Sequence, residues 1–203
     1  MLKLHIGCGP RHIPGWAHID LQPAPHVDHI ISAGHLSETF GKDSVDIIYA
    51  SHILEHFHRD AIPRVLDDWH SVLSPGGVLR LAVPDFQAIA EAYCKGIPLS
   101  DFMGLLYGGQ DHPLNFHHVA FDTESLSTLL LHAGFVDIKP WDWRKTEHRD
   151  IDDFSQAYLP HMDKDNGRLM SLNLQACKVA LTPRVLEAAS TCPCPCPFSK
   201  VGL

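Results

Sequence analysis

Short apolar runs rich in β-branched residues alternate along the chain with segments of helical periodicity. Five such runs predict strands at residues 2–6, 17–21, 27–31, 45–50 and 78–83. Two further runs, at 136–143 and 171–179, predict the last strands. Strands that alternate with helices are typical of βαβ units and a mostly parallel sheet, so the pattern predicts an α/β fold.

Apolar residues at helical spacing predict three helices between these runs. The first begins near Asp60, which can cap it, buries Leu66 and Trp69, and ends at a proline-glycine turn over residues 74–77. The second begins near Asp85, a candidate N-cap, and the third runs from Thr123 to a stop at Gly134. Residues 96–121 are rich in Gly, His and Pro, and residues 150–168 are polar, so we expect irregular structure in both.

The sequence divides into a body over residues 1–180 and a tail over 181–203. In the tail, Cys192, Cys194 and Cys196 alternate with proline. Alternating proline favours polyproline II, which turns successive thiols roughly 120° apart, so they do not converge easily on one ion. We expect a disordered tail, with metal binding as the alternative.

Composition narrows the class of protein. The chain has 203 residues, of which 45% are hydrophobic and 20% charged, as in a single globular domain. Its net charge of -8 disfavours a nucleic-acid partner, which needs a concentrated basic surface. No run approaches the ~18 apolar residues that span a bilayer. We therefore expect a cytoplasmic protein without a membrane partner.

The first predicted strand breaks into a glycine-rich turn, Gly7-Cys8-Gly9, and Asp20 ends the second. Glycines let backbone N–H groups approach a ligand, and an acid at this place can accept the hydroxyls of a ribose. The dinucleotide fingerprint G-x-G-x-x-G is not met, because His12 stands at its third glycine. The short spacing predicts a loop or single turn as the first crossover.

Three later segments complete an ordered set of motifs. They are the run from Ser44 to His56, the run Leu73-Ser74-Pro75-Gly76-Gly77-Val78-Leu79, and Ala133-Gly134-Phe135. Together with the glycine turn and Asp20, the set resembles the class I S-adenosylmethionine-dependent methyltransferases, in particular the small type 11-like group. The resemblance implies a Rossmann-like, doubly wound, mostly parallel sheet of seven strands in the order 3-2-1-4-5-7-6.

The resemblance also implies a cofactor and a set of site residues. The cofactor is S-adenosylmethionine, and S-adenosylhomocysteine is the product. The residues expected to bind it are Gly7, Cys8 and Gly9 at the methionine part, Asp20 at the ribose, Ser32 and Ala33 at the adenine, and Ser51 after the fourth strand. His5 and Arg11 depart from the family pattern, and the loop over 104–121 is expected to supply the lid of the pocket.

Methyl transfer needs mainly alignment of the acceptor with the sulfonium methyl, and a histidine near neutrality suits a general base. The candidates are His52, beside the methyl donor, and His117 or His118. The acceptor is expected to be a small molecule or a sugar-like group, and this reading assigns no metal ligand.

Two alternatives remain open at this level. His52-Ile53-Leu54-Glu55-His56 fits H-x-x-E-H, so on a helix His52 and His56 could bind zinc while Glu55 acts as the base of a hydrolase. A catalytically silent cofactor-binding scaffold would also keep Gly7, Gly9 and Asp20.

Overall fold

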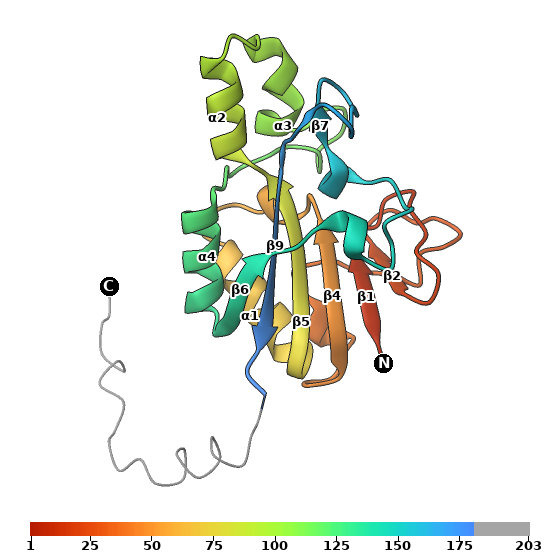
Figure 1. Cartoon of the computed structure of the whole chain (residues 1–203). Helices are drawn as coiled ribbons and strands as arrows, with labels where there is room; N and C mark the ends of the chain where they lie inside the picture. Colours follow the sequence, from red (N-terminus) through yellow and green to blue (C-terminus); the bar gives the residue numbers. More distant parts are fainter. Residues whose placement is uncertain (181–203) are drawn as a thin grey trace, which may run out of the picture.

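The computed structural model describes residues 1–180, and the predicted Cys-Pro tail lies outside the described residues. The centre of the fold is a seven-stranded sheet in the order β3-β2-β1-β4-β5-β9-β6 (Figure 1). Its strands are β1 (Lys3–Ile6), β2 (Ala17–Asp20), β3 (His29–Ile30), β4 (Val45–Ser51), β5 (Leu73–Pro84), β6 (Phe135–Pro140) and β9 (Ser171–Lys178).

The sheet order confirms the predicted topology. Strands β1 to β5 pair in parallel, whereas β9 is antiparallel to both β5 and β6. Counted within this sheet, β9 is the seventh strand, which reproduces the order 3-2-1-4-5-7-6. The strand order changes direction between β1 and β4, which pair in parallel, so the carboxyl ends of these strands border a crevice, as in other open α/β sheets.

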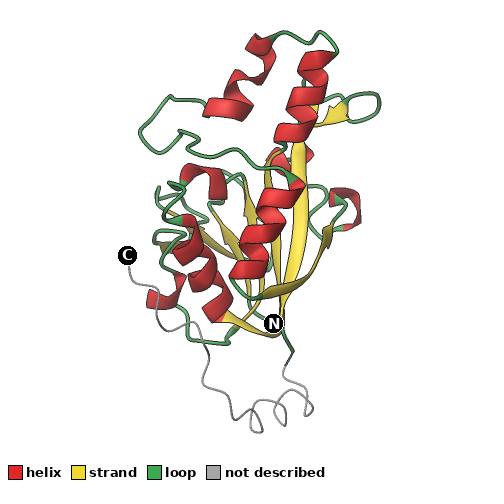
Figure 2. Ribbon diagram, turned by 90° about the vertical axis from the view of Figure 1, so that its left-hand side faces the viewer, coloured by secondary structure: helices red, strands yellow, loops and turns green. Residues whose placement is uncertain are grey.

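Helices cover one face of the sheet. α1 (Ile62–Val72) and α4 (Thr123–His132) pack against it beside the short 3-10 helix η1 (Leu36–Glu38). Figure 2 shows these helices as a layer beside the strands. Trp69, Leu66, Leu126 and Leu130 are completely buried in this aliphatic core. Asp60 does not cap α1, contrary to the prediction, because Ala61 occupies the N-cap position and no side chain bonds there.

On the opposite face, among residues 1–180, no helix lies between β1 and β2, as the short spacing predicted for the first crossover. Residues 7–16 form only turns and loop between β1 and β2. An aromatic layer covers the sheet instead, with Trp16, Tyr49 and Trp141 buried against the segment that holds η4 (Trp143–Lys145) and η5 (Phe154–Gln156). The indole of Trp141 donates a hydrogen bond to the carbonyl of Leu81 at 2.8 Å. Segment 141–156 therefore covers this face of the sheet in place of a helix between β1 and β2.

The sequence predicted a turn over residues 74–77. In the structure this proline-glycine stretch is instead part of β5. The pairing of β4 with β5 shifts register between Val45 and Ile47, where Leu73 and then Val78 are the partners. Gly76 has a φ of 82°, so the extra residues form an irregularity inside a long strand.

Above the carboxyl ends of the strands stand α2 (Phe86–Cys94), η3 (Leu99–Phe102), α3 (Met103–Tyr107) and the hairpin of β7 (Tyr158–Leu159) and β8 (Arg168–Leu169) (Figure 1). Segments 96–121 and 150–168, predicted as irregular, thus contain short helices and a hairpin. Asp85 caps α2, as predicted, by accepting a hydrogen bond from the Ala88 N–H at 3.1 Å. Within residues 1–180, no helix is long and apolar enough to cross a membrane.

Candidate functional site

A cavity of about 630 Å³ opens at the carboxyl ends of β1, β2 and β4. Of the residues predicted to bind a cofactor, Gly7, Gly9, Asp20, Ser32, Ala33 and Ser51 all line it. Five side chains from residues 112–118 border it as well, as expected of a lid; they are His112, Pro113, Leu114, Asn115 and His118. Its volume falls within the range of about 300 to 1,000 Å³ that is usual for ligand pockets.

Gly7 has to be glycine at the floor of this cavity. Its φ is 61°, in the left-handed region, and a Cβ there would lie 1.8 Å from Cδ1 of Ile53. Any other residue would therefore be strained and would displace Ile53. Gly9 also has a left-handed φ, of 53°. The two glycines turn the chain sharply after β1, and both border the cavity.

Asp20 ends β2 and is tied to the glycine turn. Its Oδ2 accepts the Gly9 N–H at 2.8 Å, and its Oδ1 accepts the Gln22 N–H at 2.9 Å. Each carboxylate oxygen keeps a second lone-pair site, so the group can still accept two ligand hydroxyls. The contacts hold the carboxylate in one orientation at the cavity wall.

The side chains of Ser51 and Ser32 are engaged by the chain itself. Ser51 Oγ accepts the Ser155 N–H at 3.1 Å, and Ser32 Oγ accepts the Gly34 N–H at 3.2 Å. Cys8 is different, because its side chain is 1% exposed and does not line the cavity. Burial, with the nearby Asp20 charge, raises the pKa of its thiol to about 11. Of the three residues of the glycine turn, Cys8 alone does not border the cavity, contrary to the prediction.

A second, smaller cavity of about 380 Å³ adjoins the first. Its walls come from the α3 region and from the segment that leads into β7, and they include Leu105, Gly108, His117, Tyr158 and Met170. His52, His56, Asn115 and Phe154 line both cavities, so the two spaces share a wall. The two cavities are therefore direct neighbours.

His52 lies in this shared wall, and His117 lies on the smaller cavity. Nε2 of His52 is 3.2 Å from Oγ of Ser171, and Nδ1 of His117 donates to the carbonyl of Leu105 at 2.9 Å. Burial holds the pKa of His52 well below its usual range and lowers that of His117 to about 4. Both imidazoles are thus neutral near pH 7. His118 instead stacks on His58, with ring centroids 4.0 Å apart.

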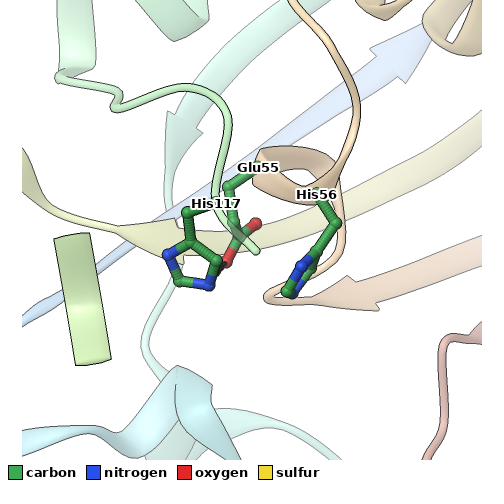
Figure 3. A group of neighbouring side chains, drawn as sticks. All are labelled: Glu55, His56 and His117. Atoms are coloured by element: carbon green, nitrogen blue, oxygen red, sulfur yellow. Dashed lines mark ion pairs between the residues drawn. The ribbon is translucent and has the colours of Figure 1, made fainter. Parts of the chain in front are cut away.

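The helical zinc pair considered for His52 and His56 is not formed. His52 precedes the 3-10 helix η2 (Leu54–His56) and has a φ of 54°, so the two rings are not on one face of an α-helix. Glu55, His56 and His117 come together instead, with one ligand atom of each within 4.8 Å of the others (Figure 3). Desolvation raises the pKa of the fully buried Glu55 carboxyl to about 8.

Sequence reasoning missed Phe154, which stands in the shared wall. It lies on η5, in a segment predicted only as polar and irregular. The guanidinium of Arg11 lies 5.0 Å above its ring, and Arg11 Nε donates to the carbonyl of Asp152 at 2.7 Å. No periodicity marks Phe154, and Arg11 was noted only as a departure from a pattern. Asp85, which also follows a strand, lines neither cavity.

A family model described as a methyltransferase domain matches residues 8–139. No curated protein matches the chain.

Several solved structures have a similar fold at low sequence identity. A 1,6-didemethyltoxoflavin-N1-methyltransferase from Burkholderia thailandensis, with bound 1,6-didemethyltoxoflavin and S-adenosylhomocysteine, is 20% identical with a TM-score of 0.52, and the match covers 88% of this chain and 71% of that one. A SAM-dependent methyltransferase from Methanosarcina mazei is 17% identical with a TM-score of 0.52, over 88% and 92% of the two chains. One from Archaeoglobus fulgidus is 14% identical with a TM-score of 0.53, over 87% and 85%. At these identities the likeness shows the fold.

Proposed function

The chain belongs to the methyltransferase domain family, and from that premise we propose that it transfers a methyl group from S-adenosylmethionine in the larger cavity to a small-molecule acceptor in the smaller one. The observation that carries the proposal is the shared wall of the two cavities at His52 and Phe154. It lets a donor and an acceptor meet while each keeps its own binding surface.

In this proposal the cofactor lies along the carboxyl ends of the strands. Asp20 accepts the ribose hydroxyls, the turn at Gly7 and Gly9 holds the methionine part, and Ser32 and Ala33 border the adenine. The fixed orientation of the Asp20 carboxylate supports the first assignment. The sulfonium then faces the shared wall.

The reaction itself is a displacement that depends on alignment. A lone pair on the acceptor attacks the methyl carbon, and the carbon–sulfur bond breaks with its electron pair on sulfur, which gives S-adenosylhomocysteine. Where the attacking atom carries a proton, His52 or His117 can take it, since both imidazoles are neutral and border the smaller cavity. Their lowered pKa values make them weak bases, so we assign most of the rate to positioning.

The smaller cavity limits the acceptor. Its size suits a small molecule or a single sugar-like group, and Phe154 and Tyr158 offer flat apolar surface for a ring. Among the described residues that line it there is no Lys or Arg, which disfavours a phosphorylated or polynucleotide acceptor.

Transfer of a labelled methyl tests the proposal. The full chain is incubated with S-adenosylmethionine that carries an isotopic methyl group, together with fractionated small-molecule extracts, and S-adenosylhomocysteine is measured. We expect product that depends on the extract and a labelled compound of low mass. Label found only in protein or nucleic acid, or no product from folded protein that binds the cofactor, would refute the small-molecule acceptor.

A further inference from the structure

The carboxylate of Glu55 is buried without a hydrogen-bond partner among the described residues. Its side chain is completely inaccessible, and neither of its oxygens accepts a hydrogen bond among the described residues. Nδ1 of His52 and Nε2 of His117 approach Oε1 to 3.3 Å and 3.9 Å. Burying such a group without compensation is costly. A bound cation that attracts both oxygens would compensate it.

Hydrogen bonds orient His56 and His117 beside Glu55 so that each can bind a metal ion through Nε2. Nδ1 of His56 lies 3.1 Å from the carbonyl of Phe116, and Nδ1 of His117 lies 2.9 Å from that of Leu105. A carbonyl only accepts, so each Nδ1 carries the proton and each Nε2 keeps its lone pair free. A histidine that ligates through one nitrogen and donates from the other to a carbonyl is the usual arrangement at a metal.

The spacing of the three groups suits one ion. All three ligand atoms lie within 4.8 Å of one another. Metal bonds of about 2.1 Å in tetrahedral geometry place two ligand atoms about 3.4 Å apart, so side-chain movements of up to about 1.4 Å close the site. The His118 N–H donates to the carbonyl of Glu55 at 2.8 Å, which fixes the loop that carries His117 against η2.

We propose that Glu55, His56 and His117 bind a divalent transition-metal ion at the wall between the two cavities (Figure 3). Two imidazoles and one carboxylate favour Zn²⁺, Co²⁺, Fe²⁺ or Mn²⁺ over Mg²⁺, which prefers oxygen ligands. Three protein ligands leave coordination positions open. The site differs from the motif H-x-x-E-H, because its third ligand comes from a loop distant in sequence and His52 is not a ligand.

His56 and His117 line the smaller cavity, so the open positions face the acceptor. This assignment of the open positions rests on the proposed function. It favours acceptors with a hydroxyl or carboxylate oxygen, because a metal ion orients either group and makes a hydroxyl more acidic. A bound ion occupies Nε2 of His117, so His52 then takes any proton that the acceptor releases. The metal site itself stands without these steps.

Cobalt binding provides the test, because Co²⁺ reports its ligands by visible absorption. Metal-free full chain carrying Cys192→Ser, Cys194→Ser and Cys196→Ser is titrated with CoCl₂, which removes the tail thiols as competing ligands. We expect one Co²⁺ per chain without thiolate bands, displaced by Zn²⁺. Glu55→Gln and His117→Ala should each weaken binding by on the order of 100-fold or more. His58→Ala, two residues after His56, should bind as the parent does.

Nitrogen-15 NMR of the histidine rings gives a readout that needs no ligand variant. Zn²⁺ should shift the Nε2 resonances of His56 and His117 and leave those of His58 and His118 in place. Absence of binding to the folded parent, or binding that keeps its strength in both ligand variants with those resonances unmoved, would overturn the metal site. Titration of the metal-free protein with S-adenosylhomocysteine is independent, so failure of the metal site and failure of the proposed function are distinguishable.

Discussion

The two cavities share a wall but are built from different parts of the chain. The larger lies on the ends of β1, β2 and β4 and on the turns that follow them. The smaller is enclosed by α3, the loop that carries His117 and the segment entering β7. One is a consequence of sheet topology, whereas the other depends on two inserts that stand above the sheet.

Their foundations differ as well. Beneath the larger cavity, β1 and β4 place His5 and Tyr49 in the aromatic layer, stacked with ring centroids 5.3 Å apart. The smaller cavity stands on an apolar cluster that includes Ala88, Phe102 and Met170. The difference teaches that donor binding in the larger cavity (the donor half) and acceptor binding in the smaller cavity (the acceptor half) can be altered separately.

The largest effect we expect is acid sensitivity of the histidine layer. Burial lowers the pKa of His5 to about 3 and that of His148 to about 4, from 6.5. Above pH 6.5 both histidines are neutral in the folded and in the unfolded chain, so the stability is at its full value. It is lost as the pH falls from 6.5 toward the pKa values of the folded state, because only the unfolded chain then takes up the protons. Between about pH 7 and pH 5 each should remove about 2 kcal/mol from the free energy of unfolding. The titratable and charged groups around them are His18, His26, Arg11, Arg80, Glu147 and Asp153.

Urea unfolding at the two pH values measures this loss, with His5→Phe as the matched variant. Phe cannot take a proton, so the variant should lose about 2 kcal/mol less than the parent between the two conditions. Equal losses in the two proteins would remove His5 from the explanation.

Asp20→Ala should act on the donor half alone. Loss of the hydrogen bonds to a ribose should weaken S-adenosylhomocysteine binding by about 1 to 3 kcal/mol, or roughly 10-fold to 100-fold in Kd. Calorimetric titration checks this, with Asp67→Ala, an exposed acid on α1, as the control. Cobalt affinity should stay as in the parent. An unchanged Kd would place the ribose elsewhere.

Gly104→Leu should act on the acceptor half alone. Gly104 lines the smaller cavity, and a Cβ there meets no heavy atom within 4 Å, so a leucine has room to grow into the space. Within a helix the change costs no helix propensity. Once an acceptor is known, its KM should rise on the order of tenfold. An equal rise in the Kd of S-adenosylhomocysteine would show that the two cavities are not separable.

Phe154→Ala should produce the smallest effect and should affect both halves. The ring is half exposed, contacts Arg11 and borders both cavities, so its removal costs on the order of 1 kcal/mol at each. Cofactor Kd and acceptor KM should therefore both rise by a few-fold. A change in only one of them would assign Phe154 to that cavity.

Much of the donor half was predictable because its residues follow strands. β-branched runs identified β1, β2 and β4, and parallel strands bring their carboxyl ends to one edge, so Gly7, Asp20 and Ser51 had to lie near each other. The turn at 74–77 was misassigned because proline and glycine also occur in bulges, and only the pairing with β4 shows which applies.

The acceptor half resisted prediction for a physical reason. His117 was a candidate base by its residue type, but its position, like that of Phe154, depends on tertiary contacts. One such contact is the hydrogen bond from the His117 N–H to the carbonyl of Tyr107 at 3.1 Å. Local sequence carries no signal for such contacts. The meeting of Glu55 with His117 likewise depends on how a distant loop folds back over η2, so the motif around His52 could not indicate that His117 lies beside Glu55.

A crystal structure of the full chain with S-adenosylhomocysteine tests the central claim most directly. We expect the ligand in the larger cavity, with its ribose hydroxyls on the Asp20 carboxylate and its sulfur at the wall formed by His52 and Phe154, facing the smaller cavity. Ligand bound elsewhere, or in the larger cavity with its sulfur turned away from that wall, would contradict the account.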